Sequence, residues 1–163
     1  MKNSFQKTIS NPIKFSGVGL HSGKKSKITL LPAEANQGII FKRIDLSKNN
    51  LVVANFNNVV SARLCTTLQN EHNVKVSTVE HLMAALYITG IDNITVEIDS
   101  EEVPIMDGSA KDFLSTLMEV DLKSQSTKRK YLKILNKVEL NDGKRSISIE
   151  PGDDSLEVQF QLD

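Results

Sequence analysis

The sequence predicts an α+β fold, with strands and helices in separate runs along the chain. The first third is rich in β-branched residues and is punctuated by glycine, which favours strands. In the middle, two segments have apolar residues at helical spacing, and a strand-like segment lies between them. Strand-like segments return near the end of the sequence, and no helical pattern follows them.

Three segments of the first third are expected to be strands, because β-branched and other apolar residues dominate them and glycine or proline bounds them. These segments are residues 13–20, 27–31 and 38–43. Residues 44–58 include two Asn-Asn pairs and are expected to be irregular.

The clearest helix is expected to begin at residues 77–80 (STVE), which have the form of a capping box. Apolar residues at helical spacing continue it. Gly90 is a natural stop for this helix. Residues 93–98 (NITVEI) alternate like a half-buried strand. A second helix is expected to begin near Ser109 and to run through Met118.

A change in amino-acid composition near residue 123 predicts a domain boundary, because residues 123–130 are polar and basic and have no hydrophobic period. We expect a first domain over residues 1–124, a linker over 125–130 and an incomplete second domain over 131–163. The strand-like runs of this last part are residues 131–140, 144–150 and 155–162.

The last part of the sequence looks like the opening of a second domain. Asp142-Gly143 predicts a tight hairpin turn between its first two runs. A sheet with one apolar face needs a layer packed against that face, and no helix follows these strands. Their uncovered apolar residues predict self-association. These residues include Leu132, Ile134, Ile147, Ile149 and Phe160.

The composition predicts a soluble cytoplasmic protein. The 163 residues carry 20 Lys+Arg and 20 Asp+Glu, and this zero net charge argues against a nucleic acid or a membrane surface as partner. The single cysteine, Cys65, excludes an intramolecular disulfide framework and is typical of a reducing compartment. No apolar run is long enough for a secretory signal or a transmembrane helix.

Two adjacent residues of the first predicted helix could carry chemistry. His81 would lie in the first turn, where the helix dipole disfavours a positive charge and keeps the imidazole in its neutral, metal-binding form. Glu80 would stay ionised there and could act as a base beside a metal-bound water. The alternative is structural: Glu80 would close the capping box on the Ser77 N–H, and His81 would be a satisfied helix residue. The spacing alone leaves both interpretations open.

The remaining candidates have weaker patterns. The histidines do not form a self-contained metal site, because no second histidine lies four residues from His81. His72 is expected in an exposed turn. His21 lies in a glycine-rich segment that leads towards a strand and not into a helix, so a hairpin or bulge is favoured over a phosphate loop. Cys65 has no sequence neighbour that would activate its thiol, so a buried small residue is expected.

Five motifs occur in a fixed order along the chain: residues 17–23 (GVGLHSG), 64–66 (LCT), 77–82 (STVEHL) with 84–86 (AAL), 90–93 (GIDN) and 104–110 (PIMDGSA). Together they closely resemble the zinc-dependent UDP-3-O-acyl-N-acetylglucosamine deacetylases of Gram-negative bacteria. These hydrolases perform the committed deacetylation in lipid A biosynthesis. The resemblance covers roughly residues 5–120 and continues more loosely through 131–163.

The resemblance implies two similar α+β domains, each a two-layer sandwich of a small sheet on helices, facing each other across a Zn²⁺ site. It implies that His81 is the first zinc ligand and that Glu80 is the general base, which takes a proton from the zinc-bound water. It places Leu64 and Cys65 beside the zinc cleft and the acyl passage, and Asp107 near a turn or helix cap.

The family's remaining zinc ligands, in a His-Lys-x-x-x-Asp motif, have no counterpart in this sequence. Its second-domain histidine, its oxyanion threonine and its UDP-facing lysine are also missing. A catalytic zinc site needs about three protein ligands. The resemblance therefore leaves two hypotheses: a deacetylase of a UDP-linked acylated glucosamine whose other half is supplied elsewhere, or an inactive, truncated fragment that self-associates through its exposed sheet.

Overall fold

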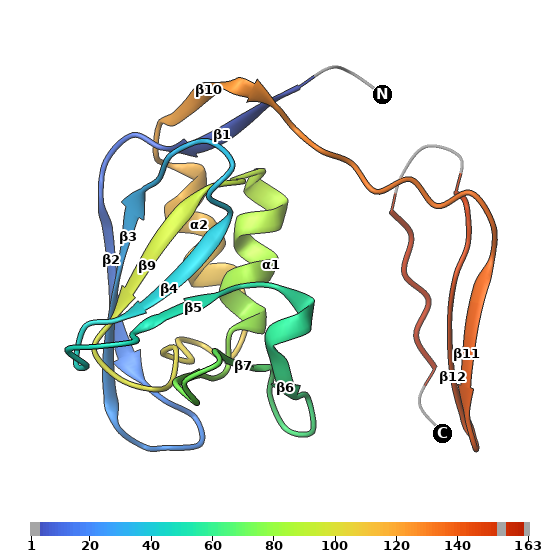
Figure 1. The fold of residues 1–163 in the computed structure, drawn as a ribbon, viewed down its shortest axis with the longest axis horizontal. Helices are drawn as coiled ribbons and strands as arrows, with labels where there is room; N and C mark the ends of the chain where they lie inside the picture. The colour runs from blue at the N-terminus through green and yellow to red at the C-terminus, as the bar shows by residue number, and fades with distance from the viewer. Residues whose placement is uncertain (1–3, 153–155, 162–163) are drawn as a thin grey trace. The chain divides into compact units, whose positions relative to one another are not determined.

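The computed structural model of the chain describes residues 4–152 and 156–161 and divides into two units, the first ending at Arg129 and the second beginning at Lys130. The first unit contains a five-stranded sheet with two helices on one side of it (Figure 1). The predicted α+β class is therefore confirmed. No helix of the described residues is long and apolar enough to cross a membrane.

The main sheet has the strand order β2-β3-β9-β4-β5, in which β4 and β9 are parallel and the other neighbours are antiparallel. Its period-2 pattern is clearest in β9, where Ile94, Val96 and Ile98 are buried and Thr95 and Glu97 are half-buried. The strands are β2 (Ile13–Val18), β3 (Lys25–Pro32), β4 (Ile39–Arg43), β5 (Leu51–Val53) and β9 (Ile94–Ile98).

The two helices, α1 (Glu80–Thr89) and α2 (Lys111–Met118), complete one hydrophobic core with the sheet. Leu82 and Leu86 of α1 are fully buried, and Phe113 of α2 meets Phe15 edge to face, with ring centroids 5.0 Å apart. Gly90 ends α1 in the left-handed conformation (φ 74°), as its position in the sequence predicts.

Most predicted elements of this unit are present, with differences over residues 13–76. The strand expected over residues 13–20 ends at Val18, because the chain turns at the following residues. The segment 44–58, expected to be irregular, contains β5 and a short 3-10 helix, η1 (Phe56–Asn58). A separate small sheet follows, with the strands β6 (Val59–Ser61), β7 (Thr67–Gln69) and β8 (Lys75–Val76).

The largest correction concerns the predicted linker over residues 125–130. Most of it belongs to β10 (Leu122–Lys128), which pairs antiparallel with β1 (Phe5–Ile9), a strand that the sequence patterns did not indicate. The reason is that buried side chains on these strands include polar ones: Gln6 is 6% exposed and Thr8 is 3% exposed. Hydrophobic alternation cannot reveal a strand whose inner face is partly made of amides and hydroxyls.

A buried amide network joins this strand pair to the main sheet. The Asn93 side-chain NH₂ donates to the carbonyl oxygens of Gln6 and Gln125, at 2.8 and 2.7 Å. The Asn93 carbonyl accepts the Gly38 N–H at 2.8 Å, and the Gln125 NH₂ donates to the Ala33 carbonyl at 2.8 Å. Each of these buried amides has a partner, which removes the cost of burying it.

An ion pair closes the end of the first unit. The Nε atom of Arg129 lies 2.8 Å from Oδ1 of Asp92, and the Arg129 guanidinium also donates to the carbonyl of Gly90. The Lys7 N–H donates to Oδ2 of Asp92 at 2.8 Å. Asp92 thus ties β1, the end of α1 and the last residue of the unit together.

The second unit contains a hairpin of β11 (Val138–Asp142) and β12 (Arg145–Ile149). Its turn is formed by Gly143 (φ 60°) and Lys144, one residue later than the predicted Asp-Gly turn. All hairpin residues are exposed. The third expected run, 155–162, is not a strand over residues 156–161, and its end residues lie outside the described part of the chain.

Replacing Asn93 with alanine should lower the free energy of unfolding by about 2–3 kcal/mol, because the side-chain carbonyls of Gln6 and Gln125 and the N–H of Gly38 lose buried partners. Urea unfolding of the chain measures the change. Asn57→Ala is the matched control, since Asn57 is exposed and its loss should change stability by less than about 0.5 kcal/mol. Equal losses in the two variants would contradict the role of the network.

Candidate functional site

A buried carboxylate brings three of the sequence motifs together. Glu102 is 3% exposed, and its Oε1 atom accepts the His21 N–H and the Thr78 hydroxyl, both at 2.9 Å. Its Oε2 atom accepts the Ser22 N–H at 2.8 Å. Burial by itself raises the pKa of this carboxyl, but the donors outweigh burial and hold the pKa below its ordinary value. Glu102 is therefore a fully hydrogen-bonded carboxylate.

The glycine-rich segment 17–23 is shaped to wrap around this carboxylate. A Cβ atom at Gly19 would lie 2.4 Å from Oε2 of Glu102, so only glycine fits there. The loop joins β2 to β3 as a hairpin connection, closed by a 3.0 Å bond from the Gly23 N–H to the Gly19 carbonyl. The hairpin interpretation of this segment is thus confirmed. His21 contributes its backbone N–H to Glu102, and the residue is exposed.

The motif at residues 104–110 packs against the same loop. The Ile105 N–H donates to the Val18 carbonyl at 3.0 Å, and a Cβ at Gly17 would lie 3.0 Å from Cβ of Pro104. Oδ1 of Asp107 accepts both the N–H and the hydroxyl of Ser109, each at 2.9 Å. Asp107 therefore shapes the turn before α2, and these bonds lower the pKa of its carboxyl.

The first helix begins without the predicted capping box. The Ser77 N–H donates to the Glu101 carbonyl at 2.8 Å and so is not available to Glu80. Val79 is the N-cap residue and makes no side-chain capping bond. The chain enters the helix through Thr78, which is 2% exposed and has φ of 56°, a left-handed conformation that a β-branched residue rarely adopts.

The side chain of Glu80 instead faces the motif at residues 64–66. Its Oε2 atom accepts the Thr66 N–H at 3.0 Å, and the Val79 N–H lies 3.4 Å from the Thr66 carbonyl oxygen. The start of α1 and the segment 64–66 are therefore neighbours in space. Within the described residues nothing donates to Oε1 of Glu80.

His81, Leu64 and Cys65 complete the set of predicted site residues. His81 is half-buried in the first turn of α1, next to Glu80. Leu64 is 80% exposed. Cys65 is half-buried and not buried as expected, with its Sγ atom 3.7 Å from the Thr67 hydroxyl oxygen. An apolar side chain and a small thiol therefore lie within two residues of Thr66, the backbone partner of Glu80.

These residues fit one part of a metal site and not a whole one. Within the described residues, no three His, Cys, Asp or Glu side chains lie close enough together to hold a metal ion. His81 can offer one imidazole nitrogen, and a catalytic zinc ion needs about three protein ligands. Among the described residues, the His81 imidazole and the adjacent Glu80 carboxylate therefore have no third His, Cys, Asp or Glu side chain beside them that would complete a metal site.

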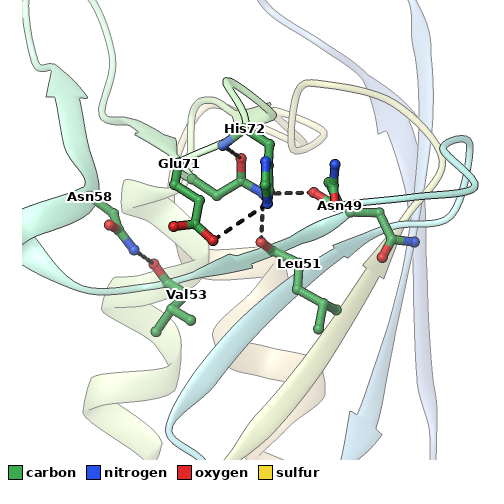
Figure 2. Close-up of a pocket in the computed structure, with 8 residues that line it drawn as sticks. Asn49, Leu51, Val53, Asn58, Glu71 and His72 are labelled. Carbon is green, nitrogen blue, oxygen red and sulfur yellow. Dashed lines mark hydrogen bonds and ion pairs between the residues drawn. The ribbon is translucent and has the colours of Figure 1, made fainter.

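An open hollow elsewhere in the first unit contains His72 (Figure 2). His72 is an exposed turn residue, as predicted, with its Nε2 atom 3.4 Å from Oε1 of Glu71. The side-chain NH₂ of Asn70 donates to the carbonyls of Asn49 and Leu51, at 2.7 and 2.9 Å. These bonds stabilise turns, so the polar character of the hollow has a structural explanation.

Glu102 was not a candidate in the sequence, although it orders more of the site than any residue that was. The available signal was weak: a glutamate that directly precedes the apolar residues Val103 and Pro104. Its donors are mostly backbone N–H groups, at separations of 80 and 81 residues along the chain. Residue types and local spacing do not reveal contacts between segments so far apart in the sequence.

Comparison with known proteins gives consistent results. A family described as UDP-3-O-acyl N-acetylglycosamine deacetylase matches residues 6–163. Proteins named UDP-3-O-acyl-N-acetylglucosamine deacetylase are similar: the one from Geotalea uraniireducens (strain Rf4) is 48% identical over 91% of this chain and 48% of its own length. That of Pasteurella multocida (strain Pm70) is 46% identical over 97% of this chain and 52% of its own length. The chain thus spans about half the length of these curated relatives.

Replacing Glu102 with glutamine should lower the free energy of unfolding at pH 7 by about 2 kcal/mol, because one NH₂ group would then face a backbone N–H. Since the folded pKa of Glu102 lies below its ordinary value of 4.5, this difference is complete above pH 4.5 and shrinks as the pH falls through the folded pKa. Urea unfolding between pH 3 and pH 7 measures it. The exposed neighbour provides the control, Glu101→Gln, and a pH-independent difference would refute the assignment.

Replacing Gly19 with alanine should cost about 1–3 kcal/mol, because the new methyl group would overlap Oε2 of Glu102 and the Ser22 hydroxyl oxygen, both 2.4 Å away. Calorimetric melting of the chain reports the loss. Ser16→Ala, at an exposed position of β2, should leave the melting temperature nearly unchanged. An unchanged melting temperature for Gly19→Ala would show that the loop can move away from Glu102.

Proposed function

Because the chain belongs to the family of UDP-3-O-acyl N-acetylglycosamine deacetylases, we propose that it carries about half of a hydrolase of lipid A biosynthesis. The reaction is removal of the acetyl group from a UDP-linked, 3-O-acylated N-acetylglucosamine. The observation that carries this proposal is the Glu80–His81 pair at the start of α1, with the Glu80 carboxylate bonded to the backbone of residues 64–66. The single free cysteine fits the cytoplasmic location that we propose.

We propose Zn²⁺ as the cofactor, with His81 as one of its ligands. The other ligands would come from the part of the family's length that this chain does not span, since its relatives are about twice as long. When bound, zinc would polarise the acetamide carbonyl and make water a better nucleophile. His81 lies in the first turn of α1, directly after Glu80.

Glu80 is suited to accept the proton of the attacking water. One of its carboxylate oxygens, Oε2, is held by the Thr66 N–H, which orients the group. The other oxygen, Oε1, has no donor among the described residues and can therefore take up a proton. General bases positioned in this way contribute typically 10²–10⁴-fold to rate.

Leu64 and Cys65 give the site an apolar margin on the side of residues 64–66. Leu64 exposes 80% of its surface and is therefore accessible to an apolar group of a ligand. The acylated substrate offers such a group. We propose that Leu64 contacts the substrate's acyl chain near the reacting amide.

Replacing Glu80 with glutamine in the complete gene product should lower kcat for acetate release about 10²–10⁴-fold and leave the zinc content unchanged. Replacing His81 with alanine should lower both the zinc content and the activity. His72→Ala is the matched control, because His72 lies in an exposed turn. Acetate release and metal analysis are the two measurements.

The 163-residue chain by itself should retain much less than one equivalent of zinc, because one imidazole is too few ligands. A full equivalent in this chain, or unchanged zinc content in His81→Ala, would refute the ligand assignment. A complete gene product without deacetylase activity would support the alternative of a non-catalytic protein.

A further inference from the structure

We propose that Glu102 is a positioning residue for the Glu80–His81 pair and that it acts through the hydroxyl group of Thr78. This inference rests on the proposed function for its consequence, and on the geometry of the helix start for its mechanism. Glu102 itself is nearly sealed from solvent and lies on a different segment from α1.

The contact between Glu102 and Thr78 fixes an unusual backbone conformation. Oε1 of Glu102 accepts the Thr78 hydroxyl at 2.9 Å, and both residues are buried. Thr78 has φ of 56°, where its β-branched side chain is strained. Such a conformation persists only when the surroundings hold it, and the carboxylate is the hydrogen-bond partner of the Thr78 side chain.

Backbone bonds hold Ser77, the residue before Thr78, against residues 101–103. The Ser77 N–H donates to the Glu101 carbonyl at 2.8 Å, and the Val103 N–H donates to the Ser77 carbonyl at 3.1 Å. Residues 101–103 therefore form a parallel bridge with Ser77 on one side of Thr78. On the other side the helix begins at once, with Glu80 as its first residue.

The helix start has no side-chain cap, so its direction depends on the bend at Thr78 and on the bonds of Val79 and Glu80 to Thr66. Glu80 and His81 follow Thr78 by two and three residues and lie in the first turn of α1. A change in the Thr78 conformation would move both functional groups relative to residues 64–66, to which Glu80 is bonded.

The test is a set of Thr78 and Glu102 variants in the complete gene product. Thr78→Val keeps the shape and the β-branch and removes the hydroxyl, so kcat should fall about tenfold to a hundredfold while KM changes less than about threefold. Thr78→Ser keeps the hydroxyl and should retain most of the activity. The double variant with Glu102→Gln should be little worse than Glu102→Gln alone, because the two groups act through one contact.

A readout that needs no activity accompanies these rates. In ¹H–¹⁵N spectra of the 163-residue chain, Thr78→Val should shift the amide signals of Glu80 and His81, and Thr78→Ser should shift them much less. The matched control is Thr89→Val at the other end of α1, where the hydroxyl bonds to the Ala85 carbonyl. It removes a hydroxyl from the same helix and should leave those two signals in place.

Unchanged amide signals in Thr78→Val, or rate losses that multiply in the double variant, would overturn the positioning role. A wild-type protein without deacetylase activity would instead overturn the proposed function, and the amide signals would still decide whether Thr78 orients the pair. If Thr78→Val fails to fold, Glu102→Gln must produce the same two amide shifts for the inference to stand.

Discussion

The buried Glu102 carboxylate is the interaction on which the arrangement of the first unit's site depends. A charge removed from water is tolerated only when hydrogen bonds replace its hydration. Here two backbone N–H groups of the β2–β3 loop and the Thr78 hydroxyl replace it. The loop, the entry to α1 and the segment before α2 must therefore assemble together, since each supplies part of what the others need. That assembly requires glycine at position 19, because a larger side chain would overlap the Glu102 carboxylate.

The local sequence pattern predicted those helices and strands that interactions between neighbouring residues determine. The apolar spacing of α1 and the alternation of β9 follow from burial on one face, the glycine stop follows from a left-handed conformation at Gly90, and the structure has all three. The sequence did not predict the β1–β10 pair, because the side chains of Gln6 and Gln125 are held by hydrogen bonds to Asn93, which is distant from both in the sequence. The predicted capping box does not form for a related reason. The Ser77 N–H donates to the carbonyl of Glu101, which is distant in the sequence.

The same distinction between local patterns and contacts of distant segments applies to the functional residues. Spacing along the helix drew attention to Glu80 and His81 but by itself favoured a structural role over a chemical one. The bond from the Thr66 N–H to Glu80 removes the capping alternative and explains why the segments 64–66 and 77–82 occur together. A complete ligand set could not be deduced from the sequence, because the described residues do not contain one. Glu102 was missed because two of its three donors are backbone N–H groups, which every sequence offers equally.

The pairing of β1 with β10 has a consequence for synthesis on the ribosome. Gln6 and Lys128 meet across 122 residues of chain, so β1 emerges before every other strand of the first unit and its partner strand β10 emerges after them. At translation rates of roughly 5–20 residues per second, β1 waits on the order of ten seconds for β10. During that interval β1 has an open strand edge, and once Asn93 has been synthesised its side-chain NH₂ lacks the Gln125 partner until β10 emerges. Pauses in translation before β10 has left the ribosome would prolong this exposed state, whereas later pauses would act on an already closed unit.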